Sequence, residues 1–464
     1  MNAEPIDAMW AAQREKDEEK EENSPEYEFA TGTTLHGLNK IADAPNWGVR
    51  LVWICIFLGC LGYSSYLITE TLLAYFSYDT VTDVSLKFEE SLDFPAVTFC
   101  NFNKYAFRKV AGNPRINVYL EPLYAFPKEY VIIGPPIYKN DGPTPTPTPT
   151  PFFYDLAGIT EYAGFQLIDG LVECSWRGER CTLKNFTRTL SQFGNCYVFN
   201  GDPEKESVKQ TVSGSGNGLH LIINVLADQY SEDPSQGGSS DVGLKVHIHP
   251  RGEPAKMDTQ GIAIGPGTHA YVGMSKINYQ NEIPPWGNCE EKKLNHYDTY
   301  TLTGCLLECR AHWVETMCNC TAMELPGNMD ICDPQTVVDC VTSVYNLIIR
   351  GRLPCKCPTP CEISTYGKSV SYAGWPNPGA AMSPSLIEKL GQDEFLRRNY
   401  CAFDVFYKSL NSKTVTQKRA MTEEDLLSAI GGSLGLFIGA SIITLAEIAE
   451  YLITRPFKFL LKKK

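Results

Sequence analysis

The sequence predicts an α+β membrane protein in which two transmembrane helices flank a large disulfide-rich domain. An apolar segment lies near each end of the 464-residue chain, and most of the cysteines lie between the two segments. The same intervening region contains strand-like runs followed by a helix-like run. The mean hydropathy of −0.20 fits this division, because a polytopic membrane protein would have a higher value.

Residues 49–76 form the first predicted transmembrane helix. From Val49 to Leu67 the sequence has one charge, Arg50 at its edge, and apolar character continues to Phe76. About 20 predominantly apolar residues suffice to cross the hydrocarbon core. Residues 1–48 contain the acidic run "REKDEEKEENSPEYE" and no cleavable signal, so we expect them to form a solvated cytoplasmic arm.

Residues 426–453 form the second predicted transmembrane helix. About 28 residues of ideal helix span about 42 Å, which exceeds the roughly 30 Å hydrocarbon core, so we expect this segment to tilt, break or project. The tail at 454–464 is basic, and the positive-inside rule therefore places both termini in the cytoplasm and residues 77–425 outside the cell. Its basic residues are Arg455, Lys458, Lys462, Lys463 and Lys464.

Cysteine usage supports the same orientation. Two of the 17 cysteines, Cys55 and Cys60, fall in the first helix, and the other 15 lie in the external segment, where an oxidising environment favours disulfides. Zinc ligation by the C-x-C pairs is the alternative, but zinc ribbons use C-x-x-C spacing. The sequons at Asn185 and Asn319 are candidate glycosylation sites on the same side.

The external segment is predicted to contain strands first and a helix later. "FPAVTFCNFN" from Phe94, "GLHLIINVLA" from Gly218 and "VGLKVHIHP" from Val242 are β-branched runs that end in turn residues. The run from Tyr300 to Cys320 is helix-like. The tract "PTPTPTPTP" over 143–151 is typical of an extended surface loop.

No catalytic constellation is recognisable, so we expect neither an enzyme nor a resident cofactor or metal, and no nucleic-acid partner. "GSGNG" at 214–218 precedes a strand and has no P-loop lysine, which favours a turn. His247 and His249 share one strand face and could contact a metal together. A solvated strand pair is the favoured interpretation, because no third ligand is indicated.

Three glycines, Gly431, Gly435 and Gly439, recur every fourth residue in the second helix. Close helix packing of the small-xxx-small kind is one explanation. Glu447 and Glu450 favour a pore, because intramembrane carboxylates are costly and face water or a partner. Several copies around an axis would shelter them, and glycine at a constriction exposes backbone carbonyls that replace an ion's hydration shell.

Four motifs together resemble the degenerin/epithelial sodium channel family, and most closely its acid-sensing branch. They are "GLFIGASIIT" with the triplet Gly439-Ala440-Ser441, "TTLHGLNKI" with the pair His36-Gly37, "FPAVTFCN" and "PPWGNC". The resemblance covers nearly the whole chain. It implies a trimer with two transmembrane helices per subunit and an extracellular domain of palm, ball, finger, thumb and knuckle regions.

The resemblance also implies roles for individual residues. The selectivity filter would be Gly439, Ala440 and Ser441, with a re-entrant segment at His36 and Gly37 below it. Tyr78 would pack on Trp286 and couple the extracellular domain to the pore. The family commonly has an aspartate where this chain has Ala429, so we expect nearby acids to attract cations. The outer-mouth acids are Glu423, Glu424 and Asp425; the other pore-lining candidates are Gly431, Gly432, Gly435, Glu447 and Glu450.

The family pattern implies a specific set of disulfides that spacing alone does not select. Cys401 has no partner in this pattern. The implied pairs are Cys100 with Cys196, Cys174 with Cys181, Cys289 with Cys361, Cys305 with Cys357, Cys309 with Cys355, Cys318 with Cys340, and Cys320 with Cys332.

The expected function is that of a ligand-gated, sodium-selective, amiloride-blocked cation channel of the plasma membrane. It would be a homotrimer or a heterotrimer with related subunits in membrane lipid, with Na⁺ as the permeant ion and a proton or peptide as extracellular ligand. A proton-insensitive peptide-gated channel, a constitutive channel and a non-conducting two-pass receptor are the alternatives.

Acid is expected to activate the homomer poorly or not at all. Positions that serve proton gating in acid-sensing relatives have changed here. Acids that could form a displaced pocket remain nearby, at Glu232, Asp233, Asp330 and Asp333. The changed positions align with Asp79, Thr80, Val212, Asn328 and Gln335.

Overall fold

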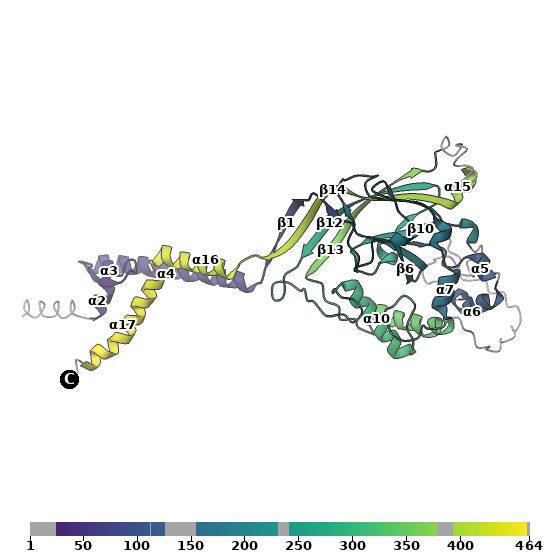
Figure 1. Ribbon diagram of the computed structural model, residues 1–464. Coiled ribbons are helices and arrows are strands. Elements are labelled where there is room, and N and C mark those ends of the chain that lie inside the picture. The colour runs from purple at the N-terminus through teal and green to yellow at the C-terminus, as the bar shows by residue number, and fades with distance from the viewer. Residues whose placement is uncertain (1–24, 112, 126–154, 231–240, 378–392, 462–464) are drawn as a thin grey trace, which may run out of the picture. The chain divides into compact units, whose positions relative to one another are not determined.

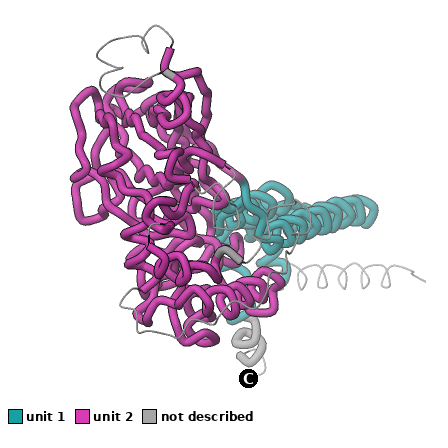
Figure 2. The backbone as a smooth tube through the Cα atoms, turned by 90° about the vertical axis from the view of Figure 1, so that its right-hand side faces the viewer, with its two compact units in different colours: residues 1–81, 418–464 teal, residues 82–417 magenta. Residues whose placement is uncertain are grey.

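The computed structural model describes residues 25–111, 113–125, 155–230, 241–377 and 393–461 (Figure 1). The chain divides into two compact units, of which the first comprises Met1–Val81 with Lys418–Lys464 and the second Thr82–Gln417 (Figure 2). The proline tract at 143–151 lies outside the described residues.

The first unit is helical. Its longest helix, α4 (Trp47–Phe76), contains the predicted first span and leaves its apolar side chains largely exposed, as expected of a helix that faces lipid. It packs along α16 (Glu423–Ile438), where the rings of Tyr63 and Phe437 lie 5.2 Å apart. The remaining helices of this unit are α2 (Pro25–Gly32), α3 (Leu38–Ala42) and α17 (Ile442–Leu461).

The second predicted span is a broken helix. The α16 and α17 axes differ by 70° across a three-residue break. Among the described residues, α4 is the one unbroken helix long and apolar enough to cross a membrane, and α16 with α17 makes a second span if both halves belong to one crossing. Breaking was one of the outcomes expected from the excess length of this segment.

The second unit is built around two sheets in which most neighbouring strands are antiparallel. The larger sheet has the order β13-β12-β14-β9-β4-β5, with β1 paired to β14, and β12 lies parallel to β14. Its strands are β1 (Thr80–Phe88), β4 (Leu171–Trp176), β5 (Glu179–Arg180), β9 (Leu219–Asn224), β12 (Thr268–Gln280), β13 (Glu362–Gly374) and β14 (Tyr400–Arg419).

The smaller sheet has the order β11-β10-β3-β7-β6, and β2 pairs separately with β8. The predicted strands from Phe94, Gly218 and Val242 are confirmed as β3, β9 and β10. The bounds are β2 (Leu92–Asp93), β3 (Ala96–Asn101), β6 (Phe186–Ser191), β7 (Gly194–Phe199), β8 (Lys209–Gln210), β10 (Leu244–His249) and β11 (Ile262–Ile264).

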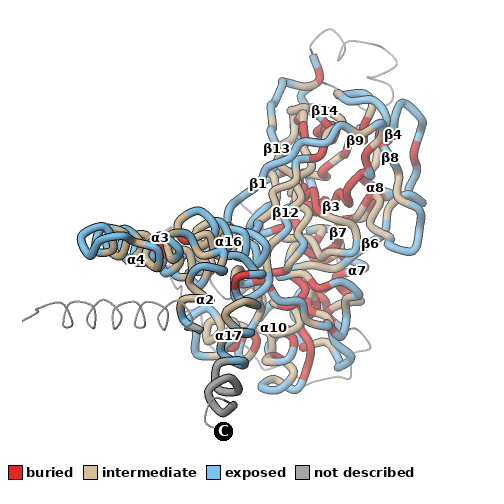
Figure 3. Tube along the Cα trace, turned by 90° about the vertical axis from the view of Figure 1, so that its left-hand side faces the viewer, coloured by how far each residue is buried: buried red, intermediate tan, exposed pale blue. Residues whose placement is uncertain are grey.

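The main core lies between these two sheets. Alternate residues of β9 and β14, such as Leu221 and Phe403, pack with Phe99 and Val246 of the smaller sheet. The rings of Phe99 and Phe403 lie 6.1 Å apart across this core. Figure 3 shows the buried residues gathered along the strands of both sheets.

Helices pack in separate clusters beside the sheets. The predicted helix from Tyr300 is confirmed as α10 (Leu302–Cys318), and Thr301 caps its first turn by accepting from Gly304 N. Its cluster includes the π-helical turn η4 (Val337–Val341) and α12 (Thr342–Ile349), and α11 (Pro334–Thr336) precedes η4 in the chain. Other helical segments are α5 (Phe107–Ala111), α6 (Pro114–Ala125), α7 (Leu156–Ala163), α8 (Leu167–Gly170), η1 (Leu183–Asn185), η2 (Ala227–Gln229), α9 (Met257–Gln260) and α15 (Asp393–Asn399).

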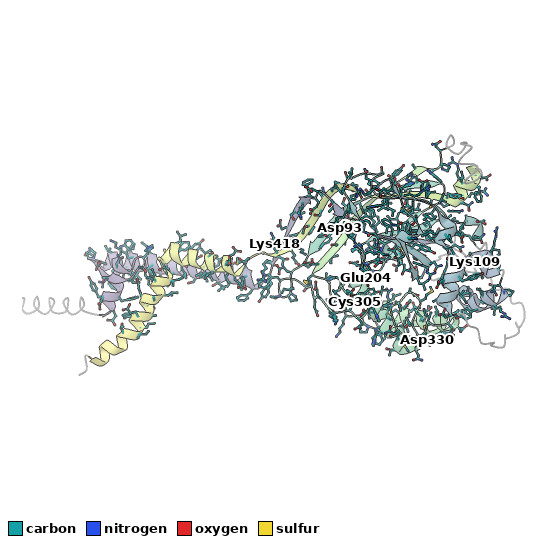
Figure 4. The ribbon with its side chains drawn as sticks, viewed as in Figure 1. Asp93, Lys109, Glu204, Cys305, Asp330 and Lys418 are labelled. Carbon is teal, nitrogen blue, oxygen red and sulfur yellow. A yellow bond between two sulfur atoms is a disulfide. The ribbon has the colours of Figure 1, made fainter. Side chains whose placement is uncertain are left out.

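The structure contains all seven disulfides that the family resemblance implies. Cys305 and Cys309, on one face of α10, bind Cys357 and Cys355. Figure 4 labels Cys305 in this helical part of the second unit. Cys401 is buried and unpaired, and burial raises the pKa of its thiol to about 12.

Candidate functional site

The break between α16 and α17 begins at Gly439. This residue adopts φ +70°, in the left-handed region that glycine enters without steric cost. Its N–H donates to the Gly435 carbonyl at 3.1 Å, and the Ala440 N–H donates to the Leu434 carbonyl at 3.2 Å. These bonds satisfy carbonyls at the end of α16 while the chain changes direction.

The segment containing His36 lies against this break. The His36 N–H donates to the Ile438 carbonyl at 2.9 Å. This carbonyl is available because α16 ends at Ile438 and no following turn supplies an N–H to it. A Cβ on Gly439 would lie 2.6 Å from the His36 ring. Gly37 has φ +90° and turns the chain into α3. Two sequence motifs that lie at opposite ends of the chain thus meet at one point.

Hydroxyl groups connect the same two segments. Ser441 and Thr444 cap the start of α17, because the Ser441 N–H donates to Thr444 Oγ1 at 2.9 Å and the Thr444 N–H donates to Ser441 Oγ at 3.3 Å. Thr444 is fully buried, and its hydroxyl lies 2.6 Å from that of Thr34. The sequence analysis gave no role to Thr34 or Thr444, although both residues lie within the quoted motifs "TTLHGLNKI" and "GLFIGASIIT".

Glu447 accepts hydrogen bonds from the N-terminal segment, whereas Glu450 accepts none from the part of that segment that the structure describes, residues 25–46. The Thr33 hydroxyl and the Thr34 N–H donate to Glu447 Oε2 at 3.0 and 3.1 Å. The Glu450 side chain is exposed. The two carboxylates that we expected to act together therefore have different surroundings within one chain.

The glycines of α16 have open surroundings. A Cβ on Gly431 or Gly432 would meet no atom within 4 Å, and one on Gly435 would meet the Ala440 carbonyl oxygen at 3.9 Å. Within one chain, these positions therefore leave room for close approach by another helix.

The predicted outer-mouth acids occupy the first turn of α16. Asp425 forms a capping box with Thr422, in which its carboxylate accepts from the Thr422 N–H at 3.0 Å. Glu423 lies 4.0 Å from Arg419, and Glu424 is exposed. All three carboxylates therefore gather at a helix N-terminus, which favours negative charge.

The two predicted coupling residues belong to different units. Tyr78 follows α4 with φ +56°, and its ring lies 6.3 Å from that of Phe76. Trp286 is half-buried in a turn of the second unit. The "GSGNG" segment at 214–218 is also a turn, as predicted.

The acid-pocket candidates differ in their surroundings. Asp333 caps α11, and the hydrogen bonds that it accepts from Thr336 and Gln335 outweigh its partial burial and lower the pKa of its carboxyl group. Asp330 is exposed, near α10 in Figure 4. Glu232 and Asp233 lie outside the described residues.

The prediction that His247 and His249 are solvated is wrong. Both are buried, because β10 is an inner strand between β11 and β3. Thr98 Oγ1 lies 2.7 Å from His249 Nε2, and the Lys256 N–H donates to His247 Nδ1 at 3.1 Å. Burial lowers the pKa of His247 to about 3 and that of His249 to about 4, so both imidazoles are neutral.

The sequon asparagines are exposed. Asn185 lies in η1, where its side-chain oxygen accepts from the Thr182 N–H at 2.9 Å. Asn319 ends α10 in the left-handed conformation with φ +55°.

The side chains of His220, His269 and Asp404 lie close together in the second unit. The sequence analysis did not connect them, because they come from three separate strands and share no local spacing.

Comparison with known proteins adds to this geometry. The family model described as "Amiloride-sensitive sodium channel" matches residues 29–451. Acid-sensing ion channel 1C of Danio rerio is 31% identical over 91% of this chain and 82% of its own length. Bile acid-sensitive ion channel of Rattus norvegicus is 33% identical over 92% of this chain and 87% of its own.

Another relative and one solved structure complete the comparison. Acid-sensing ion channel 1 of Gallus gallus is 31% identical over 91% of this chain and 82% of its own. A cryo-EM structure of a proton-activated chloride channel has a TM-score of 0.34 and 7% identity, over 88% of this chain and 98% of its own, which is too distant to bear on the fold. Since the family match spans both helical segments and the whole region between them, the chain belongs to the amiloride-sensitive sodium channel family, whose members are ion channels and not enzymes.

Proposed function

We propose that this chain is one subunit of a trimeric, sodium-selective cation channel of the plasma membrane, with α4 and the broken α16–α17 segment as its two crossings. The observation that carries the proposal is the helix break at Gly439 with the His36 ring packed against it. Irregular backbone at membrane depth is tolerated where it lines water, and a lipid anchor has no use for it.

The break is proposed to form the selectivity filter. Residues Gly439, Ala440 and Ser441 leave the helix, so their carbonyls are released from helical pairing and can point toward an axis shared by three chains. Ser441 also caps α17, which fixes where the helix resumes. One chain cannot enclose an ion here, and this supports the oligomer.

Residues 33–37 are proposed to form the re-entrant segment below the filter. Thr33 and Thr34 hold Glu447 by hydrogen bonds, and Thr34 also contacts Thr444. A carboxylate that accepts these bonds stays in place near the filter and raises the local concentration of cations. The proposed pore-lining set further includes Gly431, Gly432, Gly435 and Glu450.

The acids at the start of α16 are proposed to attract cations to the outer mouth. Three carboxylates within three residues, Glu423, Glu424 and Asp425, give each chain a concentrated negative charge, which a trimer would triple. This placement puts α16 toward the outside and the basic tail at 454–464 in the cytoplasm, so both termini would be cytoplasmic.

The extracellular domain is proposed to span residues 77–425, which include the whole second unit, with the family's palm, ball, finger, thumb and knuckle regions. Seven disulfides support an oxidising exterior. Tyr78 and Trp286 are proposed to couple this domain to the pore, and Asn185 and Asn319 to carry glycans. Homotrimers and heterotrimers with related subunits are both compatible with this proposal.

Gating is proposed to depend on an extracellular ligand, and amiloride is proposed to block the pore. The named relatives include acid-sensing and bile acid-sensitive channels, so protons and bile acids are both ligands to test, together with peptides. The lowered pKa of the Asp333 carboxyl group gives no support to a proton-sensing role for this one candidate.

The decisive experiment is to express this chain alone and record membrane current under acid, bile acid and candidate peptides, with and without amiloride. We expect an amiloride-blocked current whose reversal potential follows the sodium gradient. Replacing Ser441 with a bulky residue should shift the preference for sodium over potassium or abolish the current. Surface-expressed protein that passes no current, alone or with related subunits, would favour the non-conducting receptor.

A further inference from the structure

Three ligand-bearing side chains converge on one face of the larger sheet. Asp404 of β14 lies directly opposite His220 of β9 in the antiparallel register. On its other side β14 pairs with β12, where Asp404 lies beside Tyr271, two residues along from His269. Since side chains two residues apart share a face, three adjacent strands contribute one side chain each.

The three groups are close enough to bind one ion. His220 Nδ1 lies 2.5 Å from Asp404 Oδ1, and His269 Nε2 lies 3.4 Å from the same oxygen. All three ligand atoms lie within 4.8 Å of one another. Within the described ranges, this is the one group of at least three His, Cys, Asp or Glu side chains with such spacing.

A purely structural role does not account for all three groups. The main core lies on the other face of these strands, where Leu221 and Phe403 pack. The His220–Asp404 hydrogen bond satisfies one imidazole nitrogen, whereas His269 Nε2, although 3.4 Å from the same carboxylate oxygen, makes no well-aligned hydrogen bond. A buried polar atom without a well-formed hydrogen bond is destabilising, and a bound metal ion would give this nitrogen a partner.

We propose that His220, His269 and Asp404 form a binding site for a divalent transition-metal ion such as Zn²⁺. Two imidazoles and one carboxylate are the ligands that Zn²⁺ prefers, whereas Ca²⁺ takes six to eight oxygens. Metal–ligand bonds of about 2.0–2.2 Å in a tetrahedron separate the ligand atoms by about 3.3–3.6 Å. The His269–Asp404 distance of 3.4 Å already suits this geometry, and the 2.5 Å between His220 Nδ1 and Asp404 Oδ1 must lengthen by roughly 1 Å.

An ion bound at this site could exchange with ions in solvent. Three protein ligands leave a fourth position for water, unlike closed structural zinc sites. The His220 side chain is 25% exposed, which gives the ion a route from solvent, while His269 and Asp404 are 15% and 9% exposed. An ion bound here would join β9, β14 and β12 and be released when its external concentration falls.

The test is Zn²⁺ binding by the purified full-length protein, stripped of metal and titrated with ZnCl₂ by calorimetry. We expect one Zn²⁺ per chain at this site, not displaced by excess Ca²⁺. His220→Gln, His269→Gln and Asp404→Asn should each weaken binding at least about tenfold, since even losing an outer-shell partner costs 10–100-fold. The matched control is His296→Gln with His312→Gln, which removes two exposed histidines and should leave the affinity unchanged.

A second measurement avoids variants that fold poorly. The wild-type protein is treated with diethyl pyrocarbonate with and without Zn²⁺, and modified histidines are identified by mass spectrometry. Zn²⁺ should protect His220 and His269 but not His296 and His312. Equal modification of His220 and His269 with and without Zn²⁺, or equal Zn²⁺ affinity in the wild type and the three variants, would overturn the proposal. The group would then be a hydrogen-bonded pair beside a buried imidazole. Neither measurement depends on channel current.

Discussion

His36 and Gly439 are packed so closely that a single methyl group does not fit between them. A Cβ on Gly439 would lie 2.6 Å from the imidazole, closer than real Cβ contacts, and the backbone at φ +70° disfavours any side chain. The contact joins an N-terminal motif to the break in the second span. The contact and the positive φ together explain why residue 439 is glycine.

The first prediction is that Gly439→Ala abolishes the sodium current or shifts its reversal potential, because the break must move to relieve the clash and the strain. Patch-clamp recording with sodium and potassium gradients measures this. Gly62→Ala in α4 is the matched control, since its Cβ meets nothing within 4 Å. If Gly439→Ala conducts with unchanged selectivity at normal surface level, the proposed filter is misplaced.

The second prediction concerns the carboxylate below the break. Glu447→Gln should lower single-channel conductance, and more so at low ionic strength, because a fixed charge that concentrates cations is screened by salt. The exposed Glu450 provides the comparison, and Glu450→Gln should have the smaller effect in both conditions. Equal conductance of the wild type and Glu447→Gln at low salt would remove Glu447 from the ion pathway.

The third prediction is that acid destabilises the second unit through His247 and His249. Their pKa values of about 3 and about 4 lie below the unfolded value near 6.5, so the unfolded chain binds the protons. Stability from these groups is therefore complete above about pH 6.5 and is lost as pH falls toward 4 and then 3. The slope is about 1.4 kcal/mol per pH unit for each histidine.

Thermal unfolding of the purified protein at pH 7.5 and 5 tests this. His247→Gln should reduce the difference in midpoint between the two pH values, because it removes one of the two groups. His312→Gln, at an exposed histidine, should leave the difference as in the wild type. The same loss of stability in wild type and His247→Gln would show that other groups take up the protons.

The sequence predicted features that depend on residues near one another in the chain better than features that depend on contacts between distant segments. Apolar length placed α4 within two residues of its start. Excess length gave a break as one of three possible outcomes for the second span, and only the family resemblance singled out Gly439, Ala440 and Ser441. Local patterns did not reveal that β10 is an inner strand, so His247 and His249 were taken as solvated. His220, His269 and Asp404 come together only because β9, β14 and β12 are neighbours in the sheet with a particular register. The alternation of apolar and polar residues within one strand does not reveal that order or register.

The fourth prediction tests coupling between the two proposed parts of the channel. Trp286→Ala should reduce ligand-evoked current at normal surface level, because the indole is proposed to pack on Tyr78 in the assembled channel. Trp286→Phe should retain more of the response, since an aromatic ring remains to fill the contact. Trp313→Phe in the α10 cluster is the control for loss of an indole elsewhere. Normal gating in Trp286→Ala would leave the two aromatics with a packing role only.

The last prediction is that acid activates the homomer weakly. A proton sensor must change its protonation between pH 7.4 and about 5, and a carboxylate does so only if its pKa is raised. The Asp333 carboxyl group has the opposite shift: hydrogen bonds from Thr336 and Gln335 lower its pKa, so it stays ionised throughout this range. Its capping bonds are lost only at still lower pH, below the ordinary value near 3.9. We therefore expect a small current when external pH falls to about 5, unchanged by Asp333→Asn, which keeps an oxygen acceptor for the cap. A large, rapid, amiloride-sensitive inward current that Asp333→Asn removes would show that Asp333 titrates in the closed channel and that the surroundings seen in one chain change on assembly.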